Sequence, residues 1–214
     1  MSGYVELNPR KHRVHALLLE AVGEGRRVLD VGCSSGYLAE PLSRRGNTIV
    51  GIELDPAAAR AAEQWCERVL VGDVEAMDLP LEPASFDVIV CGDVIEHLRN
   101  PRAALERLRP FLRPGGTLVA STPNIANWAI RVSLLAGRWR YTDRGILDRT
   151  HAHLFTRATL VETLERAGYV VSRLRFSAPA PGGSDRLDAV VHGIARLRPT
   201  LFAYQWVVEA QTPS

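Results

Sequence analysis

The chain has little that would direct it to a nucleic acid, a membrane or an oxidising compartment. Its 214 residues carry 26 basic and 24 acidic side chains, so a net charge of +2 gives no general attraction for a polyanion. The three cysteines, Cys33, Cys66 and Cys91, show no paired spacing, which indicates reduced thiols. No apolar run approaches the ~20 residues of a membrane span, and Met1 to Asn8 lacks the features of a signal peptide. These absences predict a cytoplasmic protein with no membrane span and no nucleic-acid partner.

The G-x-G-x-x-G fingerprint of the Rossmann dehydrogenases is also missing. In its place, the apolar segment Val28 to Val31 runs into a turn of small residues, Gly32 to Gly36, followed by helix formers. The glycines let the backbone approach a ligand closely, and the N–H groups of a following helix suit an anionic group. A second strand, Thr48 to Ile52, ends in Glu53, 23 residues after Asp30, near the spacing of an acid that binds ribose hydroxyls. The pattern indicates a nucleoside cofactor.

The spacing Asp30-x-Gly32-x-Ser34-x-Gly36 resembles the first motif of the class I S-adenosylmethionine-dependent methyltransferases, D/E-x-G-x-G-x-G. The resemblance covers most of the chain. Within this class, the chain is similar to the ubiquinone-biosynthesis type of O-methyltransferase. It implies S-adenosylmethionine as cofactor and S-adenosylhomocysteine as product. Ser34 replaces the middle glycine, a change that is tolerated at negative φ and strained at positive φ.

Later segments match the same family at the ends of further strands. The resemblance implies that Asp73 accepts from the adenine amino group, that the backbone of Val74 meets the ring, and that Gly92 and Asp93 hold the methionyl part. The cofactor-binding residues implied in this way are Asp30, Gly32, Cys33, Ser34, Gly36, Tyr37, Glu53, Leu54, Asp73, Val74, Gly92 and Asp93.

Short apolar strands alternate with helical segments, which predicts an α/β fold with ligands at the carboxyl ends of the strands. The resemblance implies one Rossmann-like domain over residues 1–214. Its seven strands are mostly parallel in the order 3-2-1-4-5-7-6, with strand 7 antiparallel and helices on both faces. The strands predicted after the first two are Arg68 to Val71, Phe86 to Cys91, Leu112 to Ala120, Tyr169 to Ser177 and Leu201 to Gln211. The predicted helices are Pro9 to Glu24, Tyr37 to Arg45, Ala126 to Ala136, Thr156 to Ala167 and Asp185 to Arg196, with a loop at Pro179 to Ser184.

The first helix is expected to cap the sheet edge. In related enzymes an amino-terminal helix helps to close the cofactor pocket, so Tyr4, Arg10 and Lys11 are candidates to meet a carboxylate. Ordinary solvated charges at a helix start remain the alternative.

The regular alternation stops after the fifth strand, and a segment of this length needs a function. Residues 124–155 are therefore predicted to form an acceptor lid, with an amphipathic helix followed by Trp139, Arg140 and Tyr141. The arginines between Arg131 and Arg149 are interrupted by acids, so they suit an anionic small molecule at least as well as a nucleic acid.

Transfer of a methyl group to a hydroxyl needs a group that removes the proton, and histidine titrates near neutral pH. His97 follows the loop after the fourth strand, and His151 and His153 lie at the end of the lid, so these three are the predicted catalytic residues. Packing and helix capping are the alternatives for each. Asp143 and Asp148 with the two lid histidines offer atoms that bind zinc or iron, but no metal is predicted.

The predicted function is S-adenosylmethionine-dependent methyl transfer (EC 2.1.1.-), to the oxygen of a small-molecule or glycan-type acceptor, by in-line displacement. The alternatives are a non-catalytic S-adenosylmethionine-binding protein and a nucleotide-dependent oxidoreductase. The sequence predicts neither the acceptor nor the oligomeric state.

Overall fold

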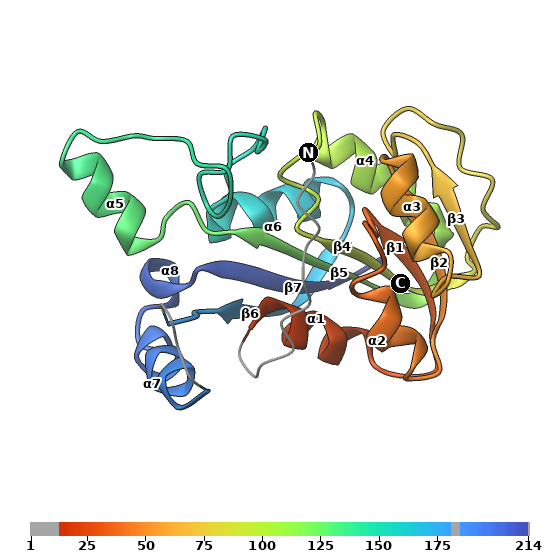
Figure 1. Cartoon of the computed structure of the whole chain (residues 1–214), viewed down its shortest axis with the longest axis horizontal. Coiled ribbons are helices and arrows are strands. Elements are labelled where there is room, and N and C mark those ends of the chain that lie inside the picture. Colours follow the sequence, from red (N-terminus) through yellow and green to blue (C-terminus); the bar gives the residue numbers. More distant parts are fainter. Residues whose placement is uncertain (1–12, 181–184, 214) are drawn as a thin grey trace.

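A sheet with helices on both faces forms the centre of the molecule (Figure 1), in a computed structural model that describes residues 13–180 and 185–213. Its strands are β1 (Arg27–Val31), β2 (Thr48–Glu53), β3 (Arg68–Val71), β4 (Phe86–Gly92), β5 (Leu112–Pro123), β6 (Val170–Ser177) and β7 (Gln205–Gln211). Within the described ranges they lie in the order β3-β2-β1-β4-β5-β7-β6. The pairs from β3 to β5 are parallel, and β7 is antiparallel to both β5 and β6. The predicted fold class and strand order are confirmed.

The described helices are α1 (Val14–Val22), α2 (Ala39–Ser43), α3 (Pro56–Ala62), α4 (Pro101–Leu108), the 3₁₀ helix η1 (Arg109–Phe111), α5 (Trp128–Leu135), α6 (Arg157–Arg166), α7 (Asp185–Ala195) and α8 (Pro199–Phe202). Four of the described helices, α3, α4, α5 and α6, begin after a residue whose side chain caps the first turn. Asp55 accepts from the backbone N–H of Ala57, and Thr156 makes a reciprocal pair of capping bonds with Thr159.

The sheet separates two apolar cores because successive side chains of a strand point to opposite faces. On one face, Val28 of β1 and Val88 of β4 belong to the core that contains the buried residues of α1 and α2. On the other face, Leu29 and Ile89 belong to the core that contains α4 and α6. Burial on both faces explains why β1 and β4 are almost continuously apolar.

The position expected for the first helix is wrong. Helix α1 contacts β4, β5, β6 and β7, so it covers a face of the sheet and not its edge. Leu17, Leu18, Leu19 and Val22 are all buried, which is more apolar surface than a sheet edge can cover.

Two predicted boundaries also need correction. The helix expected from Tyr37 begins only at Ala39, because the preceding residues continue the turn. The last strand begins at Gln205 and not at Leu201, because Pro199 starts the short helix α8. The loop expected at Pro179 to Ser184 lies partly outside the described residues.

The segment after β5 forms a separate lobe next to the sheet, with α5 projecting away from it (Figure 1). Asn127 caps α5, and the predicted helix in this segment is confirmed. Of the helices that the structure describes, none combines the length and the apolar character that crossing a bilayer requires.

Candidate active site

The carboxyl ends of β1, β2, β3 and β4 surround a cavity of about 680 Å³, here called the strand-end cavity. Its volume is typical of small-molecule sites. Ten of the predicted site residues line it: Gly32, Ser34, Tyr37, Glu53, Leu54, Asp73, Val74, Gly92, Asp93 and His97. The fold thus brings together residues that lie far apart in the sequence.

Five predicted site residues are not among those that line this cavity. Asp30 and Cys33 are buried within the protein, and Gly36 lies against Ala62 of α3. His151 and His153 lie in the segment after α5. The roles of these five residues remain predictions. Tyr4, Arg10 and Lys11, the candidates near the amino terminus, lie outside the described residues.

The turn after β1 brings backbone close to the cavity at Gly32. Gly32 has φ +70°, and a Cβ atom added there would lie 2.6 Å from Cγ2 of Val94. Only glycine fits both the backbone angle and the space. Ser34 has φ +50°, so the substitution of the family's middle glycine falls at a position with positive φ, and the turn holds a strained residue.

Glu53 fixes this turn from the end of β2. One carboxylate oxygen accepts from the backbone N–H of Ser34 at 2.8 Å, and the other accepts from that of Asp55 at 2.9 Å. Each oxygen keeps a further lone pair, and the residue lines the cavity. The carboxylate is therefore oriented by the backbone and can accept two hydroxyl groups.

The loop after β4 is held in place by hydrogen bonds of Asp93. This residue has a left-handed backbone angle, φ +54°. Its carboxylate accepts from the Ser121 hydroxyl at 2.6 Å and from the Gln205 side-chain amide at 2.8 Å. Its backbone N–H donates to the Ser121 hydroxyl at 3.0 Å. These bonds to β5 and β7 fix the position of Asp93, which lines the strand-end cavity.

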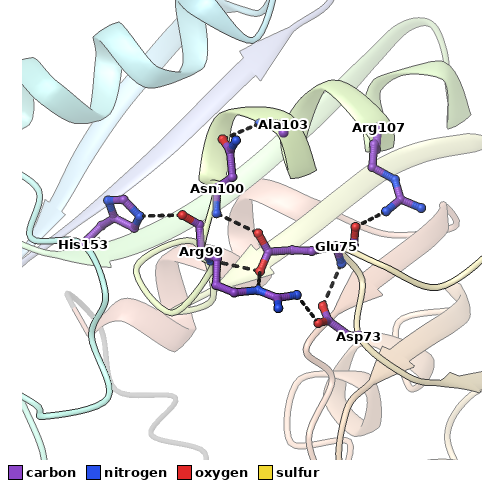
Figure 2. A network of polar contacts seen from close by, with 7 residues as sticks. All are labelled: Asp73, Glu75, Arg99, Asn100, Ala103, Arg107 and His153. Carbon is purple, nitrogen blue, oxygen red and sulfur yellow. Dashed lines mark hydrogen bonds and ion pairs between the residues drawn. The ribbon is translucent and has the colours of Figure 1, made fainter.

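A network of polar contacts forms one wall of the cavity (Figure 2). Arg99 donates to the carboxylates of both Asp73 and Glu75. The Glu75 carboxylate also accepts from the backbone N–H groups of Arg99, at 2.9 Å, and Asn100, at 2.7 Å. Burial raises the pKa of Glu75, but these bonds outweigh it and lower the pKa below its usual value. One oxygen of Asp73 is thus already paired with an arginine.

Arg99 and Glu75 line the cavity, and sequence reasoning missed both. Thr150, which reaches the same cavity from the segment after α5, was missed as well. The signal available in the sequence was weak, because a lone acid two residues after Asp73 and an arginine before a helix cap are common surface features. Only the packing of the two loops brings their side chains together.

Asp30 lies buried in β1 behind the cavity. Burial raises its pKa from an ordinary value near 3.8 to about 7, and the charge of Glu53 adds to the rise. One of its carboxylate oxygens has no hydrogen-bond partner among the described residues. The folded protein therefore favours the protonated form of this carboxyl group.

This burial predicts a pH dependence of stability. Because the pKa of Asp30 is higher in the folded chain, its contribution to stability is complete below about pH 4 and is lost as the pH rises towards 7. We expect Asp30→Asn, which cannot ionise, to have a free energy of unfolding a few kcal/mol above that of the wild type at pH 8. At pH 4 the difference should be much smaller. Urea unfolding of both proteins at the two pH values measures it, and equal differences at both would contradict the assignment.

Two of the three predicted catalytic histidines lie together. The rings of His97 and His151 make an edge contact with their centroids 4.8 Å apart, beside the buried Glu96. Nδ1 of His97 lies 3.2 Å from the Thr150 carbonyl oxygen. The loop after β4 and the end of the predicted lid therefore meet at this point.

His153 has different surroundings. Its Nε2 lies 3.2 Å from the Arg99 carbonyl oxygen (Figure 2), and its ring stacks near Phe155. The backbone N–H of His153 donates to the carbonyl of Glu96 at 3.0 Å. The residue thus ties the end of the lid to the loop after β4.

A second cavity, of about 830 Å³, lies between α5, the segment 142–147, α7 and α8, and is here called the helical cavity. Its lining is mostly apolar and includes Trp128, Ile146 and Ile194, with Arg13 and Arg144 as charged members. Tyr204 also lines it, and the charge of Asp93 contributes, after burial, to a raised pKa of this tyrosine. Because Asp93 lines the strand-end cavity, the two cavities lie close together at Tyr204 and Asp93.

A mostly parallel sheet of this order, with a cavity at the carboxyl ends of its strands, defines a Rossmann-like fold whose ligands bind at that edge. The chain also matches a family described as a methyltransferase domain over residues 6–174. It belongs to this family, whose cofactor is S-adenosylmethionine and whose reaction is methyl transfer.

Individual relatives agree with this assignment. The chain is 32% identical over 151 residues to a ubiquinone biosynthesis O-methyltransferase of Cereibacter sphaeroides, covering 68% of this chain and 60% of that protein. It is 33% identical over 162 residues to a probable S-adenosylmethionine-dependent methyltransferase of Mycolicibacterium smegmatis, covering 76% and 59%. The match to the ubiquinone-biosynthesis relatives spans 45% to 60% of their length.

Among solved structures, the chain resembles a Thermotoga maritima S-adenosylmethionine-dependent methyltransferase described as a possible histamine N-methyltransferase. The TM-score is 0.67 at 18% identity, with 94% of this chain and 89% of that chain covered. At this identity the likeness shows a common fold.

The residues of the strand-end cavity fit S-adenosylmethionine. Glu53 presents carboxylate oxygens that suit ribose hydroxyls, and Gly32 lets the turn after β1 pack closely against Val94 of the loop after β4, beside the cavity. Leu54 is an exposed apolar side chain beside the cavity that can cover an aromatic ring.

Proposed function

We propose that the protein transfers a methyl group to a hydroxyl oxygen of a small-molecule acceptor. The observation that carries the proposal is the meeting of the strand-end cavity, which His97 lines, with the end of the segment that carries His151. O-methylation releases a proton, so a group that removes it or favours its loss must lie beside the acceptor.

The residues implied by the resemblance are proposed to hold the cofactor in the strand-end cavity. Glu53 would accept from the ribose hydroxyls, Leu54 and Val74 would enclose the adenine, and Gly92 and Asp93 would support the methionyl part. When bound, S-adenosylmethionine supplies a methyl group on a positively charged sulfur. The protein then contributes mainly by aligning the acceptor oxygen with that group, which can lower a barrier by up to about 7–11 kcal/mol.

Residues 124–155 are proposed to form the acceptor side of the site. The segment lines both cavities, since Trp128 and Ile146 face the helical cavity and Thr150 faces the strand-end cavity. The mostly apolar lining, with two arginines, suits an acceptor that has an apolar body and an anionic group. The O-methyltransferase relatives support an oxygen acceptor of this kind.

A labelling experiment tests the proposal. Purified protein is incubated with methyl-labelled S-adenosylmethionine and a panel of phenolic, catecholic and aliphatic hydroxyl compounds matched to amine analogues. We expect label in an O-methyl ether, with one S-adenosylhomocysteine formed for each methyl group transferred. Label on nitrogen would overturn the oxygen acceptor. Binding of the cofactor without transfer to any member of the panel would favour a non-catalytic binding protein, and binding of a nicotinamide dinucleotide in its place would favour an oxidoreductase.

A further inference from the structure

The strand-end cavity and the helical cavity differ in charge. Arg99 balances only part of the negative charge of the strand-end cavity, which suits a positively charged sulfur and is lined by five acidic side chains, Glu53, Asp55, Asp73, Glu75 and Asp93. The described residues that line the helical cavity include no acidic side chain, and its charged members are Arg13 and Arg144. A ligand with a negative charge is therefore repelled by the first cavity and attracted by the second.

The two arginines of the helical cavity are not equivalent. Nε and Nη2 of Arg13 donate to the two carboxylate oxygens of Asp188, at 2.8 and 3.0 Å. Asp188 is 1% exposed, so breaking this pair would leave a buried carboxylate without its counterion. Arg144 is exposed and forms no ion pair within the part of the chain that the structure describes. The uncompensated positive charge of this cavity is therefore that of Arg144.

Two other polar side chains of the lining are already bonded to the backbone. Asn127 accepts from the backbone N–H of Ala129 and donates to the carbonyl oxygen of Ala203. The hydroxyl group of Thr142 donates to the carbonyl oxygen of Arg144 at 2.7 Å. The rest of the lining is mostly apolar. This surface suits a ligand with an apolar body and one charged group directed to Arg144.

Tyr204 connects this cavity to the proposed cofactor site. Its hydroxyl oxygen lies against the segment 142–147, since a Cβ atom added to Gly145 would lie 2.8 Å from it. The next residue, Gln205, donates to the carboxylate of Asp93 at 2.8 Å, and Asp93 lines the strand-end cavity. The end of the helical cavity at Tyr204 is therefore close to the cofactor site. Arg144, which precedes Gly145 in the chain, belongs to the same wall.

We propose that the methyl acceptor is a hydroxy acid with an apolar body, bound in the helical cavity with its carboxylate on Arg144. Its hydroxyl group then lies at the Tyr204 end of the cavity, next to the cofactor. Arginine can bind a carboxylate through two parallel N–H donors, which fixes the orientation of the ligand as well as its position. A cationic amine meets no opposite charge among the described residues of this lining. The inference deepens the proposed function and rests on it for the transfer step.

The carboxylate takes no part in the transfer itself. The O–H bond of the acceptor breaks, its proton passes to a base of the site, and the oxygen bonds to the methyl carbon. The methyl–sulfur bond breaks and its electron pair stays on sulfur, so no oxidant or reductant is consumed. Arg144 is thus a residue that selects and orients the acceptor, and its contribution is measured by binding.

Calorimetry on the full chain, saturated with S-adenosylhomocysteine, tests the role of Arg144. The probes are ω-hydroxydodecanoate and p-hydroxycinnamate, each compared with its neutral carboxamide. We expect at least one of the two carboxylates to bind about tenfold more tightly than its carboxamide, because an ion pair adds to the same apolar contacts. Arg144→Gln should remove this preference by weakening the carboxylate alone. High salt should reduce the preference in the wild type, since the arginine is exposed.

Two further variants show whether the effect depends on the charge at this position. Arg166→Gln is the matched control, because Arg166 is an exposed arginine that pairs with Glu162 on α6 and lines neither cavity. It should keep the preference for the carboxylate. Arg144→Glu reverses the charge and should bind ω-aminododecanol more tightly than ω-hydroxydodecanoate, a reversal that loss of structure does not produce. All three variants should bind S-adenosylhomocysteine like the wild type, which shows that they are folded.

The outcomes separate this inference from the proposed function. If neither carboxylate binds more tightly than its carboxamide, or if the preference survives Arg144→Gln, the role of Arg144 is overturned. Methyl transfer to the hydroxyl group of a carboxamide as efficiently as to that of the acid would overturn the acceptor class and leave the proposed function standing. A carboxylate preference that depends on Arg144, without methyl transfer to any hydroxyl group, would confirm the anion site while the proposed function fails.

Discussion

Replacing Glu53 with alanine is expected to weaken the binding of S-adenosylhomocysteine about a hundredfold. Hydrogen bonds to a charged acceptor contribute roughly 1.5–3 kcal/mol each, and Glu53 is proposed to accept two of them from the ribose. A hundredfold loss corresponds to about 2.8 kcal/mol, which leaves room for partial replacement by water. Calorimetric titration of the purified variant gives the affinity directly.

Two further variants separate this role from the structural role of Glu53. The side chain also accepts from the backbone of Ser34 and Asp55, so its loss disturbs the turn. Glu53→Gln keeps one acceptor oxygen and should bind with intermediate affinity. Thr156→Ala removes the cap of α6, which lies outside the lining of the strand-end cavity, costs about 1 kcal/mol of stability, and should leave the affinity within a few-fold of the wild type. Wild-type affinity in Glu53→Ala would show that the ribose assignment is wrong.

Replacing Gly32 with alanine is expected to cost stability and to reduce nucleoside binding more than tenfold. The new Cβ would lie 2.6 Å from Cγ2 of Val94, so the turn after β1 and the loop after β4 would have to move apart. A left-handed backbone angle adds about 1–2 kcal/mol for a residue with a side chain, and crowding adds about 1–3 kcal/mol. Urea unfolding and calorimetry measure the two effects.

Gly46 provides the matched control for this substitution. It has φ +75°, almost the same as Gly32, but a Cβ atom there would meet nothing within 4 Å. Gly46→Ala should therefore lose only about 1–2 kcal/mol, the cost of the backbone angle, and bind the nucleoside normally. Adding Val94→Ala to Gly32→Ala should recover part of the loss, because it removes the atom that clashes. If Gly32→Ala and Gly46→Ala behave alike, close approach at the turn has no role in binding.

The sequence predicted the strand-end residues because their positions follow from local patterns. Glycine-rich turns and acids after apolar strands can be recognised one segment at a time, and parallel strands bring their carboxyl ends to one edge. Arg99 and Glu75 escaped prediction because their pairing depends on how two loops pack (Figure 2). Asp30 was recognised as part of a motif, but its burial behind the cavity depends on the sheet around it.

The sequence by itself determined the α/β class, because short apolar strands alternate with helical segments, and the motif after the first strand determined the family resemblance that implied the strand order. It did not determine where α1 lies, since an apolar helix can cover an edge or a face and only the packing of β4, β5 and β7 selects between them. It also did not show that Glu96, His97 and His151 meet. That contact joins residues more than 50 positions apart in the sequence, and only the tertiary structure brings side chains so far apart in the chain together.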